Sequence, residues 1–184
     1  MTLRALIAVA DGVEDIETVT LIDVLRRAEI EVLVACIENR RMFTCARGSR
    51  ITADAMLIDV LAQDFDLIVL PGGMPGAQHL AEHGPLAQKV QEQAKAGKLF
   101  AAICAAPALA LQGYGVLKQR RMTCYPAFSD RLSGCTFVDQ PVVVDGNCIT
   151  SQGPATALEF ALTLVEQLVG KARCKAVAEA MLVP

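Results

Sequence analysis

The chain has 184 residues, a formal net charge of −3, a pI of about 5.4 and 53% hydrophobic residues. Its Lys and Arg residues form isolated pairs rather than a stripe, which disfavours a direct nucleic-acid site. The mean hydropathy of +0.40 is high, but no apolar stretch approaches the roughly 20 residues of a membrane helix. We therefore expect a sheet buried on both faces, with no membrane segment, and place the protein in the cytoplasm.

The N-terminal part of the chain has a β-α-β pattern. A continuous apolar run over 3–9 predicts a strand buried on both faces. Apolar residues then recur at near-helical spacing over 14–28, and a second strand is expected over 31–37. This order implies a parallel pair of strands with a right-handed crossover. The apolar residues of the predicted helix are Ile16, Val19, Ile22, Val24 and Leu25.

The rest of the chain continues to alternate between strands and helices. Asp145-Gly146 between two apolar runs predicts a hairpin. Because there is no repeat, linker or domain boundary, we expect residues 1–184 to form a single doubly wound α/β domain, with a mostly parallel sheet sandwiched by helices. Further strands are predicted at 42–45, 50–53, 66–70 and 99–103, a short strand near 122, and helices at 85–96, 105–112, 155–169 and 172–181.

The ends of three predicted strands carry residues that could form a site, which in an open parallel sheet lies past the carboxyl ends of the strands. The first strand leads to Glu17, the strand at 66–70 leads to Gly72 and Gly73, and the strand at 99–103 leads to Cys104. A cysteine at a strand-to-helix turn resembles a nucleophile elbow, and glycines let backbone N–H groups approach a ligand. The alternative is a cysteine that only packs in the core, where this residue type is common.

The other cysteines and the glycine loop argue against further kinds of site. The seven cysteines are odd in number and contain no C-x-x-C, which disfavours a disulfide framework and a zinc site. The GGMPG segment has neither the Walker lysine nor the G-x-G-x-x-G spacing of phosphate-binding loops. We expect no metal and no cofactor.

Four segments in register resemble the DJ-1/ThiJ/PfpI superfamily, closest to the branch that includes human DJ-1 and bacterial YajL. The resemblance covers essentially the whole chain and implies a flavodoxin-like α/β fold and a homodimer. The segments are DGVEDIETVTLIDVLRRAEIEV, LPGGMPGAQHL, AAICAAPALAL and TSQGPATALEFALTLVE.

The resemblance implies the catalytic part of a site. It makes Cys104 the reactive cysteine and matches Glu17 to a buried glutamic acid that hydrogen-bonds it. Gly72, Gly73 and the backbone of Ala105 match oxyanion-type N–H groups. A neutral Glu17 could donate a hydrogen bond to the sulfur, which would favour a thiolate at neutral pH.

It also implies the surroundings of that site. Arg47 matches an arginine that reaches the partner subunit's site, and Arg27 matches one that helps to line an anion-binding spot there. Gly153 and Pro154 match a segment near the dimer contact. Tyr125 departs from the pattern, because human DJ-1 has a histidine at this position.

Two functions are implied. One is a cofactor-independent glyoxalase III or protein deglycase, in which Cys104 attacks α-oxoaldehydes such as methylglyoxal or their early adducts on protein side chains. The alternative is an oxidative-stress sensor and redox-regulated chaperone, with Cys104 oxidised to sulfinic acid. A protease is disfavoured because Ala105 stands where PfpI-type proteases have histidine. His79 and His83 are expected to lie on the surface or to pack rather than to act as a base.

Overall fold

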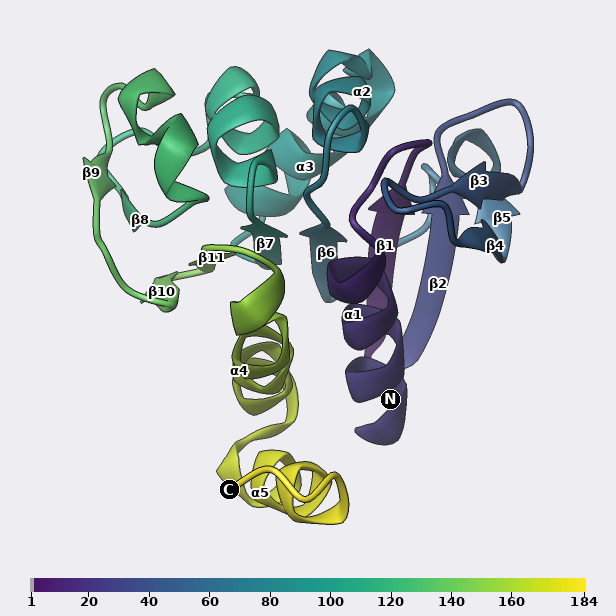
Figure 1. Cartoon of the computed structure of the whole chain (residues 1–184), viewed down its shortest axis with the longest axis vertical. Helices are drawn as coiled ribbons and strands as arrows, with labels where there is room; N and C mark the ends of the chain where they lie inside the picture. Colours follow the sequence, from purple (N-terminus) through teal and green to yellow (C-terminus); the bar gives the residue numbers. More distant parts are fainter. Residues whose placement is uncertain (1) are drawn as a thin grey trace.

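A 7-stranded sheet lies between two layers of helices in the computed structural model, which describes residues 2–184 (Figure 1). The strands are β1 (Arg4–Val9), β2 (Glu31–Cys36), β3 (Met42–Thr44), β4 (Arg50–Thr52), β5 (Ala55–Met56), β6 (Leu67–Leu70), β7 (Leu99–Ile103), β8 (Arg121–Met122), β9 (Thr136–Phe137), β10 (Val142–Asp145) and β11 (Cys148–Ser151). The α-helices are α1 (Asp15–Arg27), α2 (Gly76–Glu82), α3 (Gly84–Lys95), α4 (Ala157–Val169) and α5 (Lys171–Ala180). The short helical segments are η1 (Leu57–Asp59), η2 (Pro107–Leu111), η3 (Pro126–Arg131) and η4 (Pro154–Thr156).

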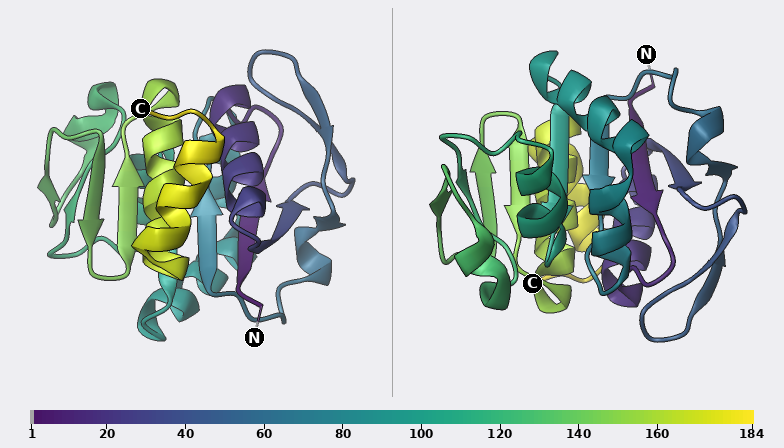
Figure 2. Two further views of the ribbon diagram at one scale, coloured as in Figure 1. Left: turned by 90° about the horizontal axis from the view of Figure 1, so that it is seen from below. Right: turned by 90° about the horizontal axis from the view of Figure 1, so that it is seen from above.

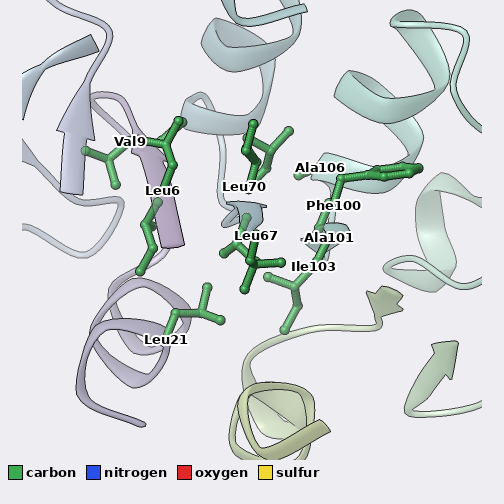
Figure 3. Close-up of a cluster of buried hydrophobic side chains, with 14 of the residues drawn as sticks. Leu6, Val9, Leu21, Leu67, Leu70, Phe100, Ala101, Ile103 and Ala106 are labelled. Atoms are coloured by element: carbon green, nitrogen blue, oxygen red, sulfur yellow. The ribbon is translucent and has the colours of Figure 1, made fainter. Parts of the chain in front are cut away.

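The two helical layers explain the high hydropathy of the chain. Helices α1 and α4 cover one face of the sheet, with α5 packed on the outer side of α4, and α2, α3 and η2 cover the other face (Figures 1 and 2). Strand β6 and, from Ala5 onward, strand β1 are therefore apolar and buried on both faces. Figure 3 shows Leu6, Leu67 and Ile103 meeting Leu21 of α1 in this core. Among residues 2–184, no helix is both long and apolar enough to cross a bilayer.

In the strand order β10-β11-β7-β6-β1-β2-β5, the order in which the chain adds strands reverses between β1 and β6. All neighbouring pairs are parallel except β10 and β11, which form the predicted antiparallel hairpin. The predicted doubly wound, mostly parallel fold is thus confirmed. The carboxyl ends of β1, β6 and β7 meet beside this reversal, where open α/β sheets bind ligands.

Several local predictions differ from the structure. Helix α2 is not predicted from the sequence, because it is only 7 residues long and too short to show a clear helical period of apolar residues. The two-residue strand β5 is not predicted either. The predicted helix at 105–112 contains the π-helical segment η2, with Pro107 in its first turn, where its missing N–H is tolerated.

Helix α1 is rotated relative to the face expected from its apolar residues. Ile16 and Val19 are 56% and 50% exposed, so they do not pack with the buried apolar residues of the helix. Leu21 and Val24 are fully buried, and Glu17 lies with them on the same side of the helix. The rotation therefore directs an acidic side chain into the protein interior.

Gly76 and Gly84 each begin a helix but differ in how closely other atoms surround them, so substituting them tests how tightly the strand ends pack. A Cβ on Gly76 would lie 2.2 Å from the Val13 backbone nitrogen, whereas a Cβ on Gly84 would meet nothing within 4 Å. We expect Gly76→Ala to lower the free energy of unfolding by about 2 kcal/mol or more. The matched control Gly84→Ala should stay within about 0.5 kcal/mol of wild type. Urea unfolding of both variants measures this, and equal unfolding midpoints would contradict the close packing.

Candidate active site

Three strand ends bring the predicted site residues together. Cys104 directly follows β7, Gly72 and Gly73 follow β6, and Glu17 lies in the first turn of the helix after β1. A Cβ on Gly72 would lie 2.5 Å from the Cys104 Cβ and 2.9 Å from the Glu17 Oε2. Only a glycine can occupy this position without moving the cysteine or the acid.

Cys104 occupies a sharp turn between β7 and η2. Its φ of +64° is in the left-handed region, which is rare for residues other than glycine. The backbone around it is held by two hydrogen bonds: the Cys104 N–H donates to the Ser151 carbonyl at 2.9 Å, and the Tyr125 N–H donates to the Cys104 carbonyl at 2.8 Å. The residue keeps 9% of its surface exposed. This is the geometry of a nucleophile elbow, with a strained backbone that presents the side chain at the end of the sheet.

Glu17 is fully buried beside this turn. Its Oε2 accepts a hydrogen bond from the Gly72 N–H at 2.8 Å. Its Oε1 is buried and has no hydrogen-bonding nitrogen or oxygen partner among the described residues. Glu14 fixes the start of the helix, because its side chain accepts the Glu17 N–H at 2.8 Å and caps α1. The buried acid is thus placed by a helix cap on one side and a glycine amide on the other.

The amides beside the sulfur differ from the predicted set. The N–H groups of Gly73 and Ala105 act on the Cys104 sulfur as hydrogen-bond donors. The Gly72 N–H is directed to Glu17 instead, so the prediction that it serves as an oxyanion donor is wrong in this arrangement. Gly73 has a φ of +87°, and a Cβ there would lie 2.4 Å from the Glu14 nitrogen. This position also requires glycine.

Burial raises the pKa of both titrating groups. Desolvation raises the pKa of Glu17 to about 7, with a further contribution from the nearby Glu14 carboxylate, while the Gly72 hydrogen bond opposes the shift. Desolvation and then the charge of Glu17 raise the pKa of the Cys104 thiol to about 12, against the Gly73 and Ala105 amides. Both shifts oppose the expected thiolate, because burial disfavours a charge on either group and a charge on one disfavours a charge on the other. The two groups titrate together, so that between their two ionisations the pair shares one proton.

A cavity of about 510 Å³ opens over the sulfur. Glu14 and Arg47 are its charged lining residues, and its other lining residues are Ala46, Gly73, Met74, Cys104, Ala105, Tyr125, Phe128 and Pro154. Among residues 2–184, no three His, Cys, Asp or Glu side chains are grouped so that they could hold a metal ion. The chemistry available in the cavity is that of a thiol, a buried acid and backbone amides.

Arg47 lines the cavity of its own chain, although it was expected to reach the site of a partner subunit. Its loop is fixed to the start of α1, because the Asp15 carboxylate accepts the N–H groups of Arg47 at 2.7 Å and Ser49 at 3.1 Å. Burial alone would raise the pKa of Asp15, but these hydrogen bonds and one from the Ser49 side chain lower it. Asp15 therefore orders the loop that carries Arg47.

Arg27 lies away from the cavity. It occupies the last turn of α1, about 15 Å along the helix axis from Glu17. Its guanidinium pairs with Asp23 at 2.7 Å. Arg27 does not line the pocket of its own chain, because the helix carries it away from the strand ends. A role in the pocket of a second subunit stays a prediction.

Tyr125 and Pro154 line the cavity as expected, and Gly153 lies behind the tyrosine. A Cβ on Gly153 would lie 3.4 Å from the Tyr125 Cδ2. Neither histidine lines the cavity: the His79 ring contacts the Asp11 carbonyl at 3.1 Å, and His83 accepts the Leu86 N–H at 3.2 Å.

Three residues of the site were missed from the sequence. Glu14 is only 8% exposed, and it both caps α1 and lines the cavity. Its position directly after the first strand end was the available signal. Met74 follows the glycine pair and Phe128 lies in a polar segment, so no pattern in the sequence set them apart.

Comparisons with known proteins identify the family of the chain. The DJ-1/PfpI family matches residues 3–167. The chain is 47% identical to DJ-1 homolog B of Arabidopsis thaliana over 92% of its own length but only 39% of that protein. It thus spans less than half of that plant relative. The glutathione-independent glyoxalase DJR-1.2 of Caenorhabditis elegans is 40% identical over 87% of this chain and 85% of that protein. The structure of oxidised DJ-1 from Toxoplasma gondii superposes with a TM-score of 0.96 at 38% identity, covering 98% of both chains.

The raised pKa of Glu17 makes a prediction for stability. Its ordinary value is 4.5 and its value in the folded protein is about 7, so the native state holds an extra proton between these pH values. This extra proton stabilises the native state. The stabilisation is fully present below pH 4.5 and is lost as the pH rises through 7, so that the free energy of unfolding falls by about 3 kcal/mol in total. Glu17→Gln lacks this ionisation, so its stability relative to wild type should rise by about that amount between pH 5 and pH 8.

Urea unfolding of the two proteins at several pH values measures the difference. All other titrating groups contribute to both curves. Parallel stability curves for wild type and Glu17→Gln would show that the Glu17 pKa is not raised by folding.

Proposed function

Because the chain belongs to the DJ-1/PfpI family, we propose that it is a cofactor-independent glyoxalase and protein deglycase. Its substrates would be α-oxoaldehydes such as methylglyoxal, or their early adducts on protein side chains. The observation that carries the proposal is the buried Glu17 beside Cys104, with the Gly73 and Ala105 amides on the same sulfur. A relative of similar length that is named a glutathione-independent glyoxalase supports it.

The first step would form a bond between sulfur and the aldehyde carbon. The Glu17 carboxylate accepts the thiol proton as the Cys104 sulfur attacks, which removes the need for a preformed thiolate. The former aldehyde oxygen becomes an alkoxide, stabilised by the Gly73 and Ala105 N–H groups. Glu17 then returns the proton to this oxygen. The product of the step is a hemithioacetal, and the carboxylate is regenerated.

The second step would move hydrogen between the two carbons. Glu17 removes the proton from the carbon bonded to sulfur, giving an enediol, and delivers it to the neighbouring carbon. The hydroxyl proton shifts between the two oxygens, and the result is a thioester of a 2-hydroxy acid. Water then adds to the thioester carbonyl, the carbon–sulfur bond breaks, and sulfur recovers a proton. The sum is addition of one water to methylglyoxal to give lactate, with no net oxidation and no cofactor.

A raised carboxyl pKa suits Glu17 for this role. A group with a pKa of about 7 can both accept and donate a proton near neutral pH. Protease chemistry is disfavoured, because the residues that line the cavity include no imidazole to protonate a leaving amine.

A second candidate function is an oxidation sensor. The solved relative from Toxoplasma gondii is an oxidised form, and Cys104 keeps some exposure at the base of an open cavity. Peroxide would add two oxygen atoms to its sulfur to give a sulfinic acid, and a protonated Glu17 could donate a hydrogen bond to the new group. This role requires that peroxide oxidise Cys104 alone. Oxidation of several of the other free cysteines to the same extent would count against it.

The homodimer implied by the sequence is part of the proposal. Ile16 and Val19 project from α1 as an exposed apolar pair, which a second copy of the chain would cover. The carboxyl-terminal helix α5 packs on α4 within the chain.

The enzyme proposal predicts the effect of two substitutions. Cys104→Ser should reduce lactate formation from methylglyoxal to about one hundredth of wild type or less, because the attacking sulfur is lost. Glu17→Gln should reduce kcat by about 10²- to 10⁴-fold, because the carboxyl group that moves the proton is lost. Lactate is measured with purified protein. Cys174→Ser is the matched control, since this half-buried free cysteine lies on α5, outside the cavity.

Full activity of Cys104→Ser would exclude the proposed mechanism. If wild type forms no lactate but peroxide oxidises Cys104 alone, the sensor is the better account.

A further inference from the structure

One wall of the cavity over Cys104 is aromatic. Tyr125 and Phe128, which we term the aromatic wall, lie with ring centroids 6.4 Å apart and planes at 63°. Tyr125 is 45% exposed and Phe128 is half-buried, so both rings retain surface that a ligand could cover. Met74 and Pro154 extend the apolar lining, whereas Glu14 and Arg47 provide charge. The cavity therefore has a distinct apolar portion.

The aromatic wall is fixed relative to the nucleophile. The Tyr125 N–H donates to the Cys104 carbonyl at 2.8 Å, and the Phe128 N–H donates to the Tyr125 carbonyl at 2.9 Å. The Arg131 guanidinium lies 5.2 Å from the centre of the Phe128 ring, which holds the segment η3 together. Buried Gly153 lies against the tyrosine ring, since a Cβ there would be 3.4 Å from the Tyr125 Cδ2. The backbone that carries the rings is thus tied to the backbone of the nucleophile.

The cavity is larger than the smallest proposed substrate requires. Methylglyoxal has five heavy atoms and occupies roughly three water volumes, or about 100 Å³. The cavity holds about 510 Å³, a size typical of pockets for larger ligands. Space beside the aromatic wall would stay filled with water when methylglyoxal is bound, and a flat apolar substituent would displace that water and stack on the rings.

We propose that Tyr125 and Phe128 are specificity-determining residues that make α-oxoaldehydes with aryl substituents better substrates than methylglyoxal. This inference rests on the proposed function and names its substrate class. Phenylglyoxal would follow the same steps: sulfur bonds to the aldehyde carbon, the hydrogen moves to the carbon that bears the ring, and water releases mandelate. The balance is again one water added, without an oxidant or reductant.

The experiment compares kcat/KM for phenylglyoxal and methylglyoxal in wild type, Tyr125→Leu and Phe128→Leu. Wild type should prefer phenylglyoxal by about tenfold or more, and each substitution should remove most of that preference, measured as the ratio of the two kcat/KM values in the same variant. Phe137→Leu is the matched control, because this half-buried phenylalanine of β9 lies outside the cavity.

A second measurement separates failure of this inference from failure of the proposed function. Phenacyl bromide and bromoacetone alkylate thiols by the same displacement of bromide and differ only in a phenyl or methyl group. Their rates at Cys104, each divided by the rate with a free thiol, should favour phenacyl bromide in wild type and lose that preference in Phe128→Leu.

The two measurements give distinct outcomes. Equal preference in wild type and both wall variants, for turnover and for alkylation, would overturn the inference. Absence of turnover with either aldehyde would overturn the proposed function and with it the aldehyde substrate class, while the alkylation ratio would still decide whether the wall selects aryl groups at the sulfur.

Discussion

The site depends on burying one carboxyl group against one thiol. Glu17 has no exposed surface and shares its environment with Cys104, so neither group can ionise at its ordinary pH. The free energy required to hold an acid in the core is reduced by a single amide, that of Gly72. What results is a pair that keeps one proton over a wide pH range and can pass it between oxygen and sulfur. Both proposed functions use this property.

The fold brings the pair together from distant parts of the sequence. At the reversal of strand order between β1 and β6, the helix that carries Glu17 lies beside the turn that carries Cys104. Gly72 and Gly73 lie between these segments, and a side chain at either position would force them apart. The positive φ of Cys104 is a strained backbone conformation, which the hydrogen bonds to Ser151 of the sheet and to Tyr125 stabilise. Tyr125 thereby serves both the turn and the cavity, which links the position of the nucleophile to the shape of the space above it.

The sequence predicted the fold well, because apolar runs such as 3–9 and a helix ended by Gly170 are local signals. It also placed Glu17, Gly73 and Cys104 at neighbouring strand ends. It could not give the rotation of α1, which exposes Ile16, or the direction of the Gly72 N–H, because both depend on packing between distant segments. The ionisation of Cys104 depends on packing in the same way, because burial raises the pKa of its thiol while the nearby amides lower it. The thiolate at neutral pH stays a prediction.

The most direct test of the shared proton is the pH dependence of Cys104 alkylation by iodoacetamide in wild type and Glu17→Gln. If one proton is shared, the wild-type rate should rise with pH and level off near 7, where Glu17 ionises, because above this pH the fraction of thiolate within the pair no longer changes. In Glu17→Gln the rate should continue to rise about tenfold per pH unit through 7 to 9, as for an isolated buried thiol. Two profiles of the same shape would contradict the account.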